Sequence, residues 1–511
     1  MSMASAPNSG PRAEQAAVLS ALRGFPANGL PAATALTDAL TRLENVADLR
    51  GLPPAWWIDF DQAVRTGNAW WTVRASETND RLHALLPEVW QWAVSVCSGD
   101  GRRREAALLE DRLPQGHPSL LPLLVVRCSD WAPPVRHRAE KRLARALTDA
   151  APGDLGLACA TAWACQPRSR GAVAVQLTTD HLPDAGPALW QALFALPDHR
   201  TRRRALAEAP QHLALSQEQF VALALTDPDV TVARSAAEHV LLQCVPPIDA
   251  ALSSNAEAVV KQLLLARNPQ VRATAVTVLR RGQRPDLAVP FLLDRSTLVR
   301  ETARWVVRSH GQDPAVQCRD LLARAGTGTP VSAGAVNGLA ECGDASDVPW
   351  LRVQLASPRP KARAAALRAL TSLAPLTTAE LLVPLEHDHS PSVGRAVVEA
   401  LTTTAHPLPH ALLQNWLAPT QLPELRRRAV SLLRASDAWT RLATDFQLLN
   451  DPDPGTARAA VSDLRNWISL TSLGHRPPSP ESKAMIDALL PAAEAVLDPH
   501  ARRQLRFRVP N

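Results

Sequence analysis

The fold of this chain is decided by the stretch Asn268-Pro269-Gln270-Val271-Arg272-Ala273-Thr274-Ala275-Val276-Thr277-Val278-Leu279. Asn268 is a favoured N-cap, and Pro269 suits the first helical position because its missing N–H would have no partner there. The apolar stripe that follows at helical spacing comprises Val271, Ala275, Val278 and Leu279. The stretch therefore predicts an amphipathic helix that starts at a capped turn and needs a neighbour to cover its stripe.

The same phrase recurs, with drift, along most of the 511 residues. Positions that match Val271 are Gly101, Val135, Ser169, Thr201, Val232, Val299, Val331, Pro360, Val393, Leu425 and Thr456. Their intervals average about 32 residues, which is typical of two-helix solenoid repeats. Because one helix pair cannot bury its apolar face alone, the copies must stack. The sequence predicts an all-α fold, an α-solenoid of about a dozen helix pairs with helical caps at both ends.

A turn with Asp or Asn and Pro, then Val-Arg, then Ala and Leu, resembles HEAT repeats, in particular the short bacterial PBS-lyase-like variety. The resemblance covers about residues 100 to 470. It implies a buried ladder in which the turn Asp and the Arg of successive repeats form hydrogen bonds. Carried over to this sequence, the ladder comprises Arg136, Arg272, Arg300, Arg395, Arg426, Asp227, Asp294, Asp388 and Asp451.

Changes of composition along the chain predict its organisation. We expect a disordered segment 1–12, a Trp-rich helical cap 13–98, the repeat array 99–472, a Pro-rich linker 473–482, and a final helix and tail 483–511. A Gly- and Thr-rich break near 326–330 is a candidate hinge within the array.

The cap contains two adjacent tryptophan pairs, Trp56-Trp57 and Trp70-Trp71. Adjacent side chains point in different directions on a helix, so one ring of each pair leaves the buried stripe. One interpretation is a cap that covers the open end of the solenoid with large rings. The other is a partner-binding patch, since Trp is enriched at interface hot spots.

Short arginine runs are the strongest indication of a nucleic-acid partner. Three of the runs fall at the start of a predicted second helix, and HEAT second helices line the concave face, so extra arginines there could follow a phosphate backbone. The candidate residues are Arg103, Arg203, Arg281 and Arg427. The alternative is that one Arg of each run belongs to the ladder and the others are solvated.

The remaining features favour a cytoplasmic protein without cofactors. The net charge of +6 is small for 55 basic and 49 acidic side chains, and the Arg- and Ala-rich, Lys-poor composition is typical of a GC-rich bacterial genome. Seven scattered cysteines are typical of buried free thiols, and no signal peptide or membrane span is predicted. The run Glu386-His387-Asp388-His389 could bind a metal, but a repeat turn explains it better.

No catalytic motif stands out, so the sequence predicts a non-enzymatic scaffold that binds another protein along its concave face. The alternative is a nucleic-acid-binding HEAT protein related to repair enzymes or glycosylases, in which Trp163, Trp190 or Trp305 would stack on bases.

Overall fold

The computed structural model describes residues 11–46, 48–66, 86–109, 117–212, 215–244, 250–324, 330–403, 408–470 and 477–509. Within these ranges the regular elements are α-helices and short 3-10 helices, and no strand occurs. The fold is all-α. The chain divides into two compact units: unit 1 contains residues 1–244 and 256–271, and unit 2 contains residues 245–255 and 272–511.

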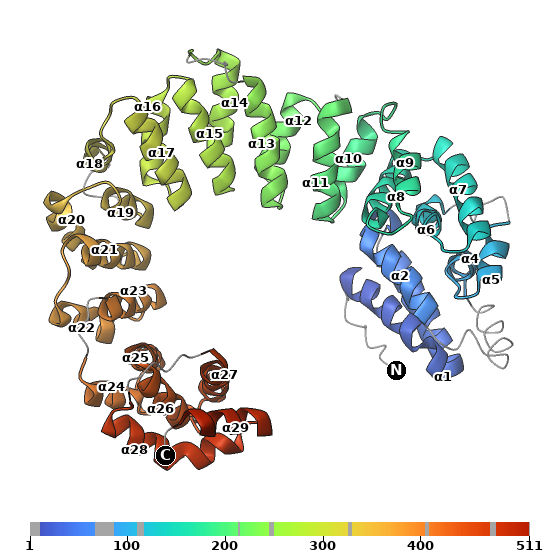
Figure 1. Cartoon of the computed structure of the whole chain (residues 1–511). Coiled ribbons are helices and arrows are strands. Elements are labelled where there is room, and N and C mark those ends of the chain that lie inside the picture. The colour runs from blue at the N-terminus through green and yellow to red at the C-terminus, as the bar shows by residue number, and fades with distance from the viewer. Residues whose placement is uncertain are drawn as a thin grey trace, which may run out of the picture. The chain divides into compact units, whose positions relative to one another are not determined.

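Unit 1 begins with a long helix and continues as a series of short helix pairs (Figure 1). Its elements are α1 (Pro11–Val46), η1 (Leu49–Gly51), α2 (Pro54–Thr66), α4 (Glu88–Val96), α5 (Gly101–Ala107), η3 (Pro118–Leu120), α6 (Leu121–Arg127), α7 (Pro133–Thr148), α8 (Pro152–Cys165), α9 (Ala172–Thr179), α10 (Pro187–Ala195), α11 (His199–Glu208), η4 (Ala209–His212), α12 (Gln217–Thr226) and α13 (Val230–Cys244). Helices α14 (Ser254–Leu264) and α15 (Pro269–Arg281) are divided between the two units.

Unit 2 repeats the same arrangement of paired helices. Its elements are α16 (Pro285–Ala288), η5 (Val289–Leu293), α17 (Thr297–Ser309), α18 (Pro314–Arg324), α19 (Ala333–Ala340), η6 (Ala345–Asp347), α20 (Val348–Val353), η7 (Gln354–Ala356), α21 (Pro360–Leu373), α22 (Thr378–His387), α23 (Pro391–Thr403), α24 (His410–Leu417), α25 (Pro423–Ser436), α26 (Ala438–Leu448), α27 (Pro454–Leu470), α28 (Pro480–Ala495) and α29 (Pro499–Arg508).

Both units have the packing of an α-solenoid. In unit 1, the first helices α6, α8 and α10 pack on one another, and so do the second helices α5, α7 and α9. In unit 2, the second helices α19, α21, α23 and α25 form one continuous layer, and α20, α22 and α24 cover it from the other side (Figure 1). Each helix pair thus buries its apolar stripe against the pairs before and after it.

Small side chains permit the close packing of the second helices. The buried face of α21 is built mainly from alanine, and the buried alanines are Ala362, Ala364, Ala365, Ala366 and Ala369. Alanine costs no side-chain entropy in a helix and lets two helix axes approach closely. The low aromatic content of the chain follows from this mode of packing.

The tryptophans of the N-terminal cap are part of its core. Trp56 is 3% exposed and Trp57 is fully buried, because α2 packs against α1 on one side and against α6 and α8 on the other. The Trp56 indole N–H donates to the Gln15 carbonyl at 3.2 Å. A partner-binding patch at Trp56 and Trp57 is therefore wrong, while Trp70 and Trp71 lie outside the described residues.

The helices at the two ends of the chain differ in their bounds and number from those predicted from the sequence. Helix α1 begins at Pro11, so residues 11 and 12 are helical, and residues 1–10 lie outside the described part. Two C-terminal helices, α28 and α29, replace the single helix that we expected. Residues 325–329 of the candidate hinge and 471–476 of the linker region are not among the described residues.

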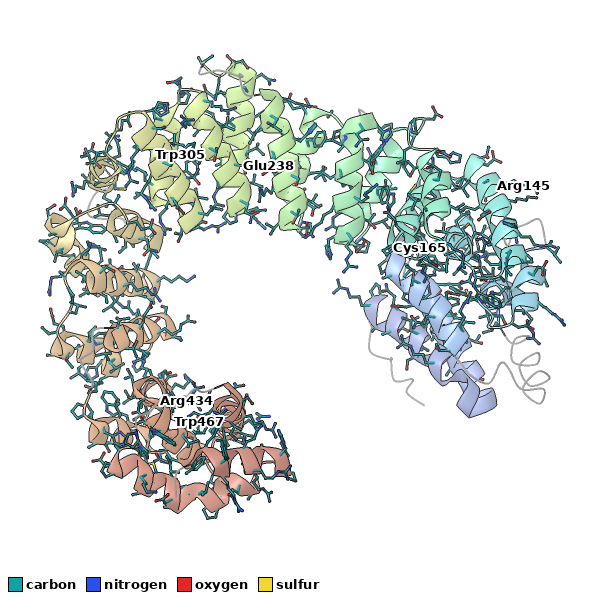
Figure 2. All side chains as sticks on the ribbon, viewed as in Figure 1. Arg145, Cys165, Glu238, Trp305, Arg434 and Trp467 are labelled. Carbon is teal, nitrogen blue, oxygen red and sulfur yellow. The ribbon has the colours of Figure 1, made fainter. Side chains whose placement is uncertain are left out.

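The C-terminal end of unit 2 is closed by aromatic packing. Trp467 is fully buried, its ring centroid lies 5.8 Å from that of Trp439, and its N–H donates to the Ala438 carbonyl at 2.8 Å. Arg434 lies nearby in the same part of the unit (Figure 2). Across the described helices of the chain, none is long and apolar enough to cross a membrane.

Candidate functional site

An arginine recurs at the fourth residue of most second helices. From this position a side chain points back over the N-terminal turn of its own helix. The arginines concerned are Arg104, Arg136, Arg202, Arg272, Arg300, Arg363 and Arg426. Arg104, Arg202 and Arg363 were not among the ladder residues predicted from the sequence.

Each complete rung of the ladder connects two consecutive turns. Arg363 donates to the Ser357 carbonyl of its own turn at 2.8 Å and to the Asp388 carboxylate of the next turn at 2.7 Å. Asp388 in turn accepts the Ser390 backbone N–H at 2.9 Å, so one carboxylate both caps its turn and holds the preceding repeat. Arg202 bonds in the same way to the Leu196 carbonyl and to Asp227, at 2.8 and 3.0 Å.

The other predicted ladder residues lie in related contacts. Arg272 bonds Asp294 through two nitrogens at 2.9 and 2.8 Å, and Arg426 pairs with Asp451. Arg300 reaches the Asp294 carbonyl at 2.8 Å but forms its ion pair with Glu341. Arg136 donates to the Asp130 carbonyl at 2.9 Å.

Arg395 is the exception, and its place in the ladder was predicted wrongly. Helix α23 begins at Pro391, so its fourth residue is Gly394, and Arg395 points to solvent. The buried Arg428 of the next second helix donates instead to the carbonyls of Leu385 and Asp388. Burial lowers the pKa of Arg428.

The ladder is denser at the N-terminal cap of unit 1. Asp130 accepts hydrogen bonds from Arg65, Arg104 and Arg127 at 3.0, 3.0 and 2.8 Å, and Asp61 accepts from Arg65 at 2.9 Å. Burial raises the pKa of Asp61 although the neighbouring arginine favours its charged form. These ion pairs connect α2 to the first repeats, and they compensate the charges that are deeply buried there.

The four arginines proposed for a phosphate-binding stripe do not all share one helix position. Arg103 is the third residue of α5, Arg203 and Arg427 are the fifth residues of α11 and α25, and Arg281 is the last residue of α15. Arg203 is paired with Asp229 at 2.8 Å, and Arg427 lies 3.1 Å from Glu424. Trp163 and Trp190, proposed for base stacking, are 9% and 0% exposed, while Trp305 is 47% exposed and lies beneath the Arg280 guanidinium, 5.1 Å away (Figure 2).

Unit 2 contains a groove lined by cationic residues, which we call the basic groove. It has a volume of about 680 Å³ and follows the N-terminal turns of α19, α21 and α23. Its lining residues include four exposed cations, Arg295, Arg359, Lys361 and Arg395, and no Asp or Glu. Prolines and small residues, such as Ala333 and Pro391, also line it.

A second groove, the apolar groove, has a volume of about 960 Å³. It lies between two consecutive repeats, and its apolar walls come from Leu355, Leu367, Val383 and Pro384. Val383 is 62% exposed on α22. The rim carries an ion pair between Arg352 and Glu380. Pro360, Ser390 and Pro391 line both grooves, so the two grooves adjoin each other.

The His-Asp-His run lies on the rim of the apolar groove. The Asp388 carboxylate accepts hydrogen bonds from Arg363 and from the Ser390 backbone N–H of its own turn. The His387 side chain is 76% exposed. In the described part of the chain, no three His, Cys, Asp or Glu side chains are grouped so that they could hold a metal ion.

Comparison with known proteins identifies the repeats that form these grooves. The family model for HEAT repeats matches residues 348–434, which extend from α20 into α25. These residues are HEAT repeats. Both grooves lie mainly on the HEAT repeats, and the basic groove extends beyond them to Arg295 and to the start of α19.

Solved structures similar to the chain include Kap121p and Kap121p bound to Ste12p. They have 14% and 13% identity and TM-scores of 0.28 and 0.29, and the matches cover 94% and 96% of this chain. The chain spans 55–56% of the length of these proteins. No curated protein matches the chain.

Proposed function

We propose that the chain is a non-catalytic scaffold that binds an extended segment of another protein in the apolar groove and the adjoining basic groove. The observation that carries this proposal is the apolar groove itself, an open channel of about 960 Å³ between consecutive HEAT repeats. Ligand-binding sites in proteins have volumes of about 300–1,000 Å³. The channel is large enough for several side chains of a bound segment.

The energetics of the groove favour an apolar anchor. Full burial of a Leu, Val or Ile side chain contributes about 1.5–3 kcal/mol. Val383 offers such a side chain an exposed apolar surface, and Leu355 and Leu367 extend that surface into the groove. One or two anchors would give the weak to moderate affinity that is common for scaffold proteins.

The ladder supports binding by holding the groove in one conformation. Arg363 and Asp388 line the apolar groove and connect its two turns through the 2.7 Å ion pair. A groove that is ordered before binding loses less conformational entropy when a ligand enters. Asp388 and Glu380 each form an ion pair with an arginine. These carboxylates therefore support binding rather than acid–base chemistry.

Nucleic acid is the alternative partner, and the cations of the basic groove are the observation that favours it. Two observations weigh against it. Neither groove is lined by a Phe or Trp ring on which a base could stack, and none of the four candidate arginines lines either groove.

Selection from a random peptide library on the immobilised chain tests the proposal. We expect enrichment of peptides with an apolar anchor, and an affinity loss of at least about tenfold in Val383→Asp, because the new carboxylate would be buried under the anchor. Val316→Asp is the matched control, since Val316 is 46% exposed on α18 and lies outside both grooves. Failure to select any peptide, or equal binding by the two variants, would overturn the proposal.

A further inference from the structure

We infer that the bound segment is acidic and that its carboxylates lie in the basic groove while its apolar anchor occupies the apolar groove. This inference rests on the proposed function and adds the chemical class of the partner. The occupant is an extended acidic peptide of another protein.

The charges of the basic groove are unusual for unit 2. Among the described residues, Arg359, Lys361 and Arg395 form no ion pair. Nearby exposed arginines do: Arg368 on α21 pairs with Glu399 on α23 at 3.0 Å, and Arg352 pairs with Glu380. The surface thus pairs its cations beside the groove, whereas these three cations within the groove have no acidic partner.

The backbone adds to the positive potential. The first turns of α19, α21 and α23 all line the basic groove, and helix N-termini favour anions through their free N–H groups. At α21 the N-cap residue is Arg359, whose side chain makes no capping bond. A ligand carboxylate close to this turn would face both the guanidinium and an uncapped helix start.

The dimensions fit a short peptide. Neighbouring helices pack about 8–10 Å apart, so the three helix starts span about 16–20 Å. An extended chain advances about 3.3 Å per residue, which corresponds to about five or six residues along the groove. Side chains alternate in direction along such a segment, so about three of them can face the cations.

A peptide fits the two grooves better than a nucleic-acid strand does. The basic groove adjoins the apolar groove at Pro360, Ser390 and Pro391, so a phosphate backbone that continued beyond the cations would meet apolar walls. A peptide can change from acidic to apolar within one residue.

The experiment uses the full chain and the peptides selected from the random library. Fluorescence anisotropy compares wild type with Lys361→Glu/Arg395→Glu, for which we expect an affinity loss of about tenfold or more and weaker binding at higher salt. The matched control is Arg465→Glu/Arg503→Glu, which changes the net charge equally at two exposed arginines outside both grooves. Circular dichroism checks that both variants fold, and Lys361→Gln/Arg395→Gln should give an intermediate loss.

Each outcome has a distinct meaning. Acid-rich peptides that lose affinity only in the groove variant support the inference. Apolar peptides without acidic enrichment, equally bound by both charge variants, overturn it while the proposed function stands. Failure of the library to yield any peptide refutes the proposed function itself. Tighter binding of a single-stranded oligonucleotide, in competition with the peptides, assigns the basic groove to nucleic acid and overturns the inference.

Discussion

Arg428 on α25 occupies the space that Gly394 leaves open on α23, one repeat earlier. A Cβ atom on Gly394 would overlap the Arg428 guanidinium. Arg428 donates there to the Asp388 carbonyl, which lies six residues before Gly394. In other repeats the fourth-position arginine donates to the carbonyl six residues before itself, as Arg363 does to Ser357. Arg428, from the neighbouring second helix, therefore makes the hydrogen bond that the fourth-position arginine makes in other repeats.

Gly394→Ala should destabilise unit 2 by about 1–3 kcal/mol, because the added methyl group displaces the Arg428 head and breaks its charge-assisted hydrogen bonds. Better helix propensity offsets only about 0.5–1 kcal/mol of this loss. Thermal and urea unfolding measure the effect. Arg395→Ala, at the exposed next residue, is the control and should change stability by less than about 0.5 kcal/mol.

The double variant Gly394→Arg/Arg428→Ala distinguishes this explanation from simple crowding. An arginine at the fourth position of α23 could donate to the Asp388 carbonyl as it does elsewhere in the ladder. We expect the double variant to recover most of the stability that Arg428→Ala alone loses. Additive losses would show that the two positions do not exchange one arginine.

The fold could be predicted from the sequence because the capped Pro turns and the apolar stripes are local signals. The ladder was predicted less well because Val-Arg was aligned as a phrase, without fixing where each helix begins. In α23, Ser390-Pro391 sets the start, so Arg395 is the fifth residue. A shift of one residue turns a side chain by about 100° around a helix, from the buried turn to solvent.

Arg272→Ala should cost about 3–5 kcal/mol, because Asp294 would remain buried without its cation. The Arg272 and Asp294 side chains are 6% and 10% exposed, so solvent replaces little of the lost interaction. Arg281→Ala, at the exposed end of the same helix, should be nearly neutral. Equal unfolding midpoints for the two variants would contradict a structural role for this rung.

The two grooves could not be predicted from the sequence. Arg295, Arg359 and Arg395 belong to three different repeats, and their approach depends on the offset between stacked helices. Nothing in the local pattern separates these cations from paired ones such as Arg203. The sequence also could not predict that Trp56 and Trp57 are both buried, because their burial requires other helices to cover α2 on two sides.

Cys342 should be more reactive than Cys159 and Cys165. Its sulfur lies 3.7 Å from that of Cys318, whose hydrogen bond lowers the pKa of Cys342, with further help from Arg304. Burial raises the pKa of Cys165 to about 11 and that of Cys159 to about 12. Because the thiolate reacts, iodoacetamide at pH 8 should label Cys342 at least about tenfold faster than these residues.

Mass spectrometry of partly labelled protein measures the order of reaction. Cys318→Ala removes the thiol that shares this hydrogen bond and should slow the labelling of Cys342. Faster labelling of Cys159 or Cys165 than of Cys342 would contradict the assignment.

Asp445 should make unit 2 less stable as the pH rises. Burial, with the hydrogen bond to Asp463, raises the pKa of Asp445 to about 8, well above its ordinary value of 3.8. Between these values the folded protein holds a proton that the unfolded chain has lost, so the free energy of unfolding falls with increasing pH across this window.

Asp445→Asn mimics the protonated acid, since its oxygen can still accept from Arg434, which donates to Asp445 at 2.8 Å. Its melting temperature should therefore fall less between pH 5 and 8 than that of wild type. Asp487→Asn, at an exposed carboxylate, is the control, and parallel curves for all three proteins would refute the prediction.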